Sequence, residues 1–159
     1  MLARSLFVVS ALALVATGCS VRKIPGTDLD DNDDTRAILD VMERYRTAVE
    51  QKDAQTLIGL VSETFMDDGG STDPEDDLSY KDLYTKLPAR LEKLEDIRLE
   101  LNVKKIEFTE DLSGARATYT YTETFRMPKL SQKPQSETEI KQMIFKRADK
   151  KVWKIVSGV

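Results

Sequence analysis

The sequence predicts an α+β domain in which N-terminal helices pack in a curved, mostly antiparallel sheet. Three observations support this prediction. Apolar residues recur with helical spacing in the first half of the chain, and they alternate with polar residues in the second half. The helical segments come first, and turn residues join the later segments as hairpins. A length of 159 residues suits one domain with a hydrophobic core.

The first predicted helix begins at Asp34 or Thr35, since either residue can cap a helix N-terminus. Asp53 is expected to open a second, shorter helix. The apolar residues expected to face the core are Ile38, Val41, Met42, Tyr45 and Val49 in the first helix, and Leu57, Leu60 and Val61 in the second.

A polar loop is predicted over residues 67–77, which are rich in Asp and Gly and lack apolar side chains. Ser79 and Asp82 have the spacing of a capping box, which predicts a third helix. Pro88 is expected to end or kink that helix.

Four strands are predicted after residue 96. Residues 97–103 alternate, but residues 106–108 have the opposite phase, which predicts a β-bulge near Lys104-Lys105. Residues 115–127 carry Ala, Tyr, Phe and Met on one face and Thr and Arg on the other. Residues 128–134 are expected to form a loop, and strands over 138–147 and 152–157 follow.

The composition excludes several classes of chemistry. The chain has no His, which rules out Ser-His-Asp catalysis and His-ligated zinc. One Cys rules out an intramolecular disulfide and a Cys-cluster metal site. Residues 19–79 carry a net charge of −10 and residues 80–159 a net charge of +5, yet the basic residues alternate with acidic ones. We therefore predict no nucleic-acid binding.

The N-terminus has the pattern of a secretory signal. Arg4 precedes an apolar run from Leu6 to Ala16, which is too short to span a bilayer. The run ends at Ala16-Thr17-Gly18-Cys19, which resembles the lipobox of bacterial lipoproteins. The resemblance implies cleavage before Cys19 and lipidation of that cysteine. The alternative is an ordinary secretory signal with a cysteine there by chance.

The chain is accordingly divided into three parts. Residues 1–18 form the lipoprotein signal peptide, residues 19–33 an acidic flexible tether, and residues 34–159 the folded domain. Ser20 follows the cysteine, and by resemblance to diderm lipoproteins this favours the outer membrane. The expected location is the cell envelope, with the domain facing the periplasm and the membrane contacted through lipid on Cys19.

The folded part resembles the nuclear transport factor 2-like superfamily, which includes SnoaL-type cyclases and ketosteroid isomerases. The resemblance is carried by Tyr45–Asp53, by Leu60-Val61, by Phe65–Asp68 and by the closing Val152–Ser157. It implies a cone-shaped fold whose mouth often holds a small apolar ligand. It supports the fold far better than any activity.

Four residues are candidates for catalysis or ligand binding. Tyr45 matches the helix-one tyrosine that donates a hydrogen bond to an oxyanion in the isomerases, and Asp67 or Asp68 lies near the position of their catalytic Asp. Glu123 follows from the strand pattern alone, because it is the one ionisable residue on the apolar face of 115–127. It would act as general acid or base. Each has a structural alternative: a core tyrosine, turn-forming aspartates, and a hydrated glutamate at the rim.

Two functions remain open. The preferred one is a non-catalytic domain that binds a small apolar ligand or a protein partner, without a cofactor, and that forms a homodimer through its sheet edge or its Thr/Arg face. The alternative is a small-pocket enzyme of isomerase or dehydratase type that uses carboxylate and tyrosine groups. The two differ in whether Tyr45, Glu123 and Asp67 or Asp68 converge on one open cavity.

The acidic runs also raise the question of calcium. Asp28, Asp30, Asn32 and Asp34 alternate like the start of an EF-hand loop. However, Asp33 stands where that loop needs glycine, and Leu39 where it needs a bidentate glutamate. Solvated charge is the simpler interpretation, and we predict no metal site.

Overall fold

The computed structural model describes residues 21–68, 77–128 and 131–158. Its elements are α1 (Asp33–Gln51), α2 (Ala54–Leu60), β1 (Met66–Asp67), β2 (Leu78–Ser79), α3 (Tyr80–Glu92), β3 (Glu95–Phe108), β4 (Gly114–Met127), β5 (Ser131–Asp149) and β6 (Val152–Ser157). The predicted signal peptide and Cys19 lie outside the described residues. Within those residues, none of the helices is long and apolar enough to cross a membrane.

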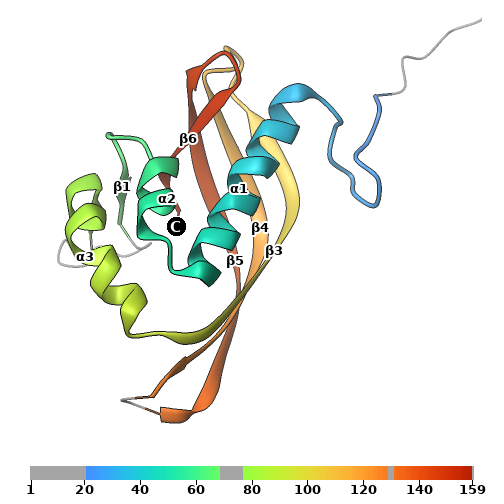
Figure 1. Cartoon of the computed structure of the whole chain (residues 1–159). Coiled ribbons are helices and arrows are strands. Elements are labelled where there is room, and N and C mark those ends of the chain that lie inside the picture. Colours follow the sequence, from blue (N-terminus) through green and yellow to red (C-terminus); the bar gives the residue numbers. More distant parts are fainter. Residues whose placement is uncertain (1–20, 69–76, 129–130, 159) are drawn as a thin grey trace, which may run out of the picture.

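The main sheet is antiparallel with strand order β3-β4-β5-β6, and β1 and β2 form a small second ribbon. Helices α1 and α2 lie across one face of the curved sheet, α3 lies beyond α2, and the C-terminus lies beside α2 and β1 (Figure 1). The α+β prediction, with helices packed in a curved antiparallel sheet, is therefore confirmed.

The helix signals are mostly confirmed. Asp53 caps α2, and Ser79 with Asp82 forms the capping box of α3. The cap of α1 is Asn32, whose side chain accepts the N–H of Thr35, so the predicted caps Asp34 and Thr35 are wrong. Pro88 does not end α3, because the helix continues to Glu92.

The predicted strands are confirmed, and one of them is longer than predicted. The pairing register shifts between Val103 and Lys105, where a bulge was predicted. Strand β5 begins at Ser131, so the predicted loop over 128–134 is too long. Pro134 lies in the register irregularity between the pairs Phe125–Gln135 and Met127–Ser131, where the missing N–H of proline is tolerated.

The core lies between α1 and the inner face of the sheet. Ile38 and Met42 of α1 pack with side chains of β3, β4, β5 and β6. The largest fully buried side chains include Trp153, Tyr119, Phe145, Met143 and Ile155. The alternation predicted for residues 115–121 is confirmed, since Ala115, Ala117, Tyr119 and Tyr121 are buried.

The acidic run at the start of α1 is ion-paired. Asp33 binds Lys151 at 2.7 Å. The carboxylate of Asp34 accepts two hydrogen bonds from Arg147, at 2.7 and 2.8 Å, and one from Trp153 Nε1 at 3.3 Å. These partners lie on β5, on β6 and in the turn between them. Asp33 and Asp34 therefore connect the start of α1 to the β5–β6 hairpin. The interpretation as solvated charge is wrong for Asp34, which is 25% exposed, whereas Asp33 is 76% exposed and its ion pair lies at the surface.

Asp34 should make stability depend on pH. The Arg147 guanidinium holds the pKa of Asp34 below its usual value. A lowered pKa in the folded state means that the stabilisation is present above the unfolded value of about 3.9 and is lost as pH falls through the folded pKa. We expect Asp34→Asn to lower the free energy of unfolding by about 1–2 kcal/mol at pH 7.

Urea unfolding of both proteins between pH 7 and pH 2 measures this effect, and the difference should shrink below pH 4. The control is Asp30→Asn, which removes an ion pair to Lys23 whose two side chains are each 52% exposed. A difference between wild type and Asp34→Asn that stays constant down to pH 2 would contradict the assignment.

Candidate functional site

A cavity of about 270 Å³ opens between the C-terminal half of α1, helices α2 and α3, and strand β4. Most of its lining is aliphatic and comes from both sides of the gap. The aliphatic lining residues are Val49, Leu57, Val61, Leu78, Leu83, Leu87, Leu91 and Leu94. Such a cavity excludes bulk water from most of a small ligand and favours an apolar one.

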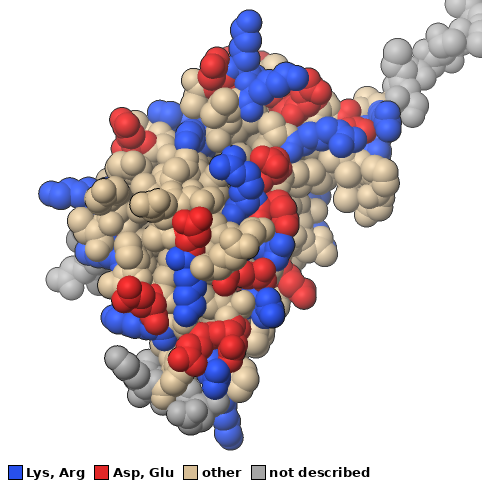
Figure 2. Space-filling view, viewed as in Figure 1, with Lys and Arg blue, Asp and Glu red and all other residues tan. Residues whose placement is uncertain are grey.

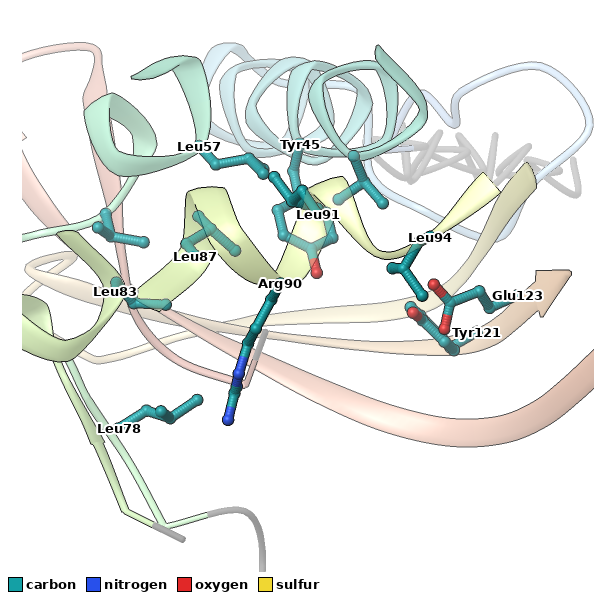
Figure 3. A pocket seen from close by; sticks show the side chains of 12 residues that line it. Tyr45, Leu57, Leu78, Leu83, Leu87, Arg90, Leu91, Leu94, Tyr121 and Glu123 are labelled. Atoms are coloured by element: carbon teal, nitrogen blue, oxygen red, sulfur yellow. The ribbon is translucent and has the colours of Figure 1, made fainter. Parts of the chain in front are cut away.

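The polar residues lining the cavity are Tyr45, Tyr121, Glu123 and Arg90. Tyr45 projects from α1 with its hydroxyl toward the cavity, and the Tyr121 hydroxyl lies beside the Glu123 carboxylate (Figure 3). Two of the four predicted candidates, Tyr45 and Glu123, are thus brought to the same cavity from elements far apart in sequence.

The two tyrosines of the cavity stay protonated. Burial raises the pKa of Tyr45 well above its usual value, and the nearby Tyr119, Glu123 and Asp67 raise it further. Burial also raises the pKa of Tyr121, helped by Tyr45 and Glu123, and the hydrogen bond that Tyr121 donates to Glu123 adds to the effect. Both phenols are therefore hydrogen-bond donors at neutral pH, and Glu123 is the acceptor among them.

Asp67 binds the C-terminal segment and does not line the cavity. Its Oδ2 accepts the N–H of Gly158 at 2.7 Å, and the Tyr119 hydroxyl donates to the Gly158 carbonyl oxygen at 3.1 Å. Burial, together with the charge of Asp67, raises the pKa of Tyr119 to about 12. Asp67 and Tyr119 therefore hold the C-terminal segment in place.

Gly158 fits this arrangement only as glycine. Its φ is +88°, and an added Cβ would lie 1.9 Å from the carbonyl oxygen of Gln142. The segment that Asp67 and Tyr119 hold is therefore packed tightly against β5. Asp68 is exposed, and neither Asp67 nor Asp68 lines the cavity. The convergence of Tyr45, Glu123 and an aspartate that an isomerase-like site requires is not seen.

Two polar residues of the cavity were not predicted from the sequence. Tyr121 precedes Glu123 by two positions on the same strand face, so the alternation that identified Glu123 also contained Tyr121. Arg90 is an exposed cation on α3 that lines the cavity with Leu83 and Leu87 of the same helix. Its spacing from those leucines, i+7 and i+3, is the signal that identifies it.

A cation of β5 contacts the ring of Tyr121. Lys141 Nζ of β5 lies 4.3 Å from the ring centroid of Tyr121, a cation–π contact that holds the ring in position. Its ammonium group pairs with Glu139 at 3.7 Å. This contact helps to keep the Tyr121 hydroxyl beside the Glu123 carboxylate.

The outer face of β4 carries the predicted Thr and Arg residues. Thr122 Oγ1 lies 3.2 Å from Thr138 Oγ1 across the β4–β5 pair. Ile140, which pairs with Thr120, is 78% exposed on this face. The face therefore presents a mixed polar and apolar surface, and its use in a homodimer or by a protein partner stays a prediction.

Charges on the helical side of the molecule are interleaved. Lys, Arg, Asp and Glu alternate over the face shown in Figure 2, without a broad region of one sign. On α1, for example, Arg46 binds Glu43 at 2.6 Å and Glu50 at 2.7 Å. On this face, basic residues are neighbours of acids.

Comparison with solved structures identifies the fold. A conserved protein from Planctomyces limnophilus superposes with a TM-score of 0.65 at 15% identity, over 79% of this chain and 92% of that one. A nuclear transport factor 2-like superfamily protein from Salmonella enterica gives 0.62 at 15% identity, over 77% and 86%. The chain has the nuclear transport factor 2-like fold.

A ketosteroid isomerase-like protein from Erwinia carotovora gives a TM-score of 0.62 at 13% identity, over 80% of this chain and 95% of that one. Identities this low show the nuclear transport factor 2-like fold alone. No family model and no curated protein matches the sequence. A shared fold does not determine function, which depends on the groups that line the cavity.

Proposed function

We propose that this chain is a lipoprotein of the outer membrane, anchored through Cys19, whose periplasmic domain binds a small, mostly apolar molecule without transforming it. The observation that carries the binding proposal is the cavity, in which aliphatic side chains surround polar groups that include an acceptor, Glu123, and a donor, Tyr45. A hydroxyl group on the ligand satisfies both, since it donates to Glu123 and accepts from Tyr45.

Binding is favoured over catalysis by the position of the aspartates. An isomerase or dehydratase using carboxylate and tyrosine groups needs a positioned base and a proton donor at the same substrate. Asp67 instead accepts the amide of Gly158, and Asp68 does not line the cavity. Glu123 is left as the carboxylate of the cavity, where the hydrogen bond from Tyr121 suits a fixed acceptor.

Ligand recognition is tested with 2-naphthol and naphthalene, which differ by one hydroxyl group. We expect wild type to bind 2-naphthol more tightly than naphthalene. Tyr45→Phe and Glu123→Gln should each reduce 2-naphthol affinity by about fivefold to tenfold, or ~1–1.4 kcal/mol, with naphthalene affinity little changed. Isothermal titration provides the affinities.

Thr124→Val is the matched control, because Thr124 neighbours Glu123 on the opposite face of β4 and its hydroxyl bonds Ser136. It should bind both probes as wild type does. If wild type shows no preference for 2-naphthol, the proposed roles of Tyr45 and Glu123 are wrong.

The membrane anchor is tested separately. We expect the wild-type chain, expressed in a diderm bacterium, to incorporate labelled palmitate and to fractionate with outer membranes. Cys19→Ser should lose both properties, because the chain has no other thiol. Wild type without label, together with a Cys19→Ser chain that still partitions with membranes, refutes the anchor.

A further inference from the structure

Residues 22–32 form a folded unit, here called the N-terminal clip, where the sequence predicted a flexible tether over 19–33. Lys23 and Asp30 form an antiparallel bridge. The N–H of Asp31 donates to the Arg22 carbonyl oxygen at 2.7 Å, and the N–H of Ile24 donates to that of Leu29 at 2.9 Å. The clip is therefore closed by its own backbone hydrogen bonds.

The clip is also fixed to the domain. Leu29 is only 6% exposed and lies with Lys104, Ile106 and Phe108 of β3 around a shared surface hollow. The carboxylate of Asp31, whose side chain is 6% exposed, pairs with both Arg22 of the clip and Arg36 of α1. Acids that would repel one another in a tether are thus paired within the fold.

The clip leaves little free chain before the anchor. Ser20 and Val21 alone stand between Cys19 and the clip, and two extended residues reach about 7 Å. A flexible segment over the whole of 20–33 would reach on the order of 45 Å. The choice between these two lengths decides how far a Cys19-anchored domain stands from the bilayer.

The cavity lies toward the opposite end of α1 from the clip. Asn32, the last residue of the clip, caps the N-terminus of α1, whereas Tyr45 and Val49 line the cavity. Twelve residues from Asp33 to Tyr45 rise about 18 Å along the helix axis. In Figure 1 the N-terminal segment leaves at one end of α1, and α2 and α3 lie around the other.

We infer that the N-terminal clip holds the domain directly on the membrane surface, with the N-terminal end of α1 toward the lipid headgroups and the cavity facing the periplasm. The ligand is then a small amphiphile that enters from the aqueous side, in place of a lipid taken from the bilayer. This inference rests on the proposed anchor at Cys19.

The test uses the full-length lipidated protein in vesicles whose headgroups carry a nitroxide quencher. Because lipid occupies the Cys19 sulfur, an introduced cysteine is the one free thiol. A fluorophore is attached in separate variants at Lys104→Cys, beside the clip, and at Thr85→Cys, exposed on α3. We expect headgroup quenching to be several-fold stronger at position 104 than at 85, while aqueous iodide quenches the fluorophore at 85.

Two further variants separate the clip from the anchor. A linker of ten residues, alternating Gly and Ser, is inserted between Ser20 and Val21. It lengthens the free chain without altering the clip, and it should reduce headgroup quenching at position 104. Leu29→Asp opens the clip and should do the same, whereas Val21→Asp, at a 60% exposed position, should not. Circular dichroism verifies that Leu29→Asp leaves the domain folded.

Equal headgroup quenching at positions 104 and 85, or no response to the inserted linker, would overturn the inference. Palmitate incorporation is measured on the same samples. Protein that carries palmitate but shows equal headgroup quenching at positions 104 and 85 refutes the orientation and leaves the anchor intact. Protein that carries no palmitate refutes the anchor itself.

Discussion

Trp153→Ala is expected to lower the free energy of unfolding by about 3–5 kcal/mol, as truncation of a buried aromatic residue does. Trp153 is 2% exposed, and its ring lies 5.9 Å from that of Phe108 between centroids. The Arg147 guanidinium stacks 4.4 Å from the ring centroid, and Nε1 donates to Asp34. The substitution therefore leaves a cavity, and it also removes the surface that positions the ion pair between α1 and β5.

Trp153→Phe is the matched control for this prediction. It keeps most of the ring packing and loses the hydrogen bond to Asp34, so a loss of about 1–2 kcal/mol is expected. Trp153 is the one tryptophan of the chain, so urea unfolding is followed by far-ultraviolet circular dichroism. A loss for Trp153→Ala no greater than the roughly 0.5 kcal/mol typical of surface substitutions would refute this account of the core.

Leu87→Trp is expected to occlude the cavity. Leu87 lines it from α3 and is half-buried, so a larger ring can turn into the cavity with little strain on the backbone. We expect the affinity for the apolar fluorescent probe N-phenyl-1-naphthylamine to fall by at least about tenfold, or ~1.4 kcal/mol. The thermal unfolding temperature should stay the same or rise, because the new side chain fills empty space.

Tyr84→Trp controls for the added indole. Tyr84 lies on the same helix, is 65% exposed and does not line the cavity. This variant should bind the probe as wild type does. If the Leu87→Trp protein is folded and still binds the probe as tightly as wild type does, the probe binds elsewhere. The proposal that the cavity is the binding site would then be wrong.

Periodicity alone predicted the parts of the fold that depend on local pattern. Alternation placed Glu123 on the inner face of β4, and the phase slip at Lys104-Lys105 located the bulge. Both signals come from neighbours in sequence, because a strand exposes alternate residues to each face. The same alternation was sufficient to bring Glu123 to the cavity, although not to name its partner Tyr121.

Features that depend on distant partners could not be predicted in this way. Asp34 pairs with Arg147, 113 residues later, and nothing in the acidic run around Asp34 indicates that partner. Asp67 resembled a catalytic carboxylate because of its motif, but its acceptor oxygen is directed to Gly158, 91 residues away. Local sequence patterns do not indicate which acidic residue will bind a residue that is distant in sequence in the folded protein.

The central claim is that the cavity is an open binding site with Tyr45 and Glu123 as its polar contacts. The most direct measurement is a crystal structure of a chain beginning at Ser20, grown with 2-naphthol. We expect naphthol density between Leu57 and Leu91, with the naphthol oxygen within hydrogen-bonding distance of Tyr45 and Glu123. Leucine side chains closed on one another, with no density between them, would contradict it.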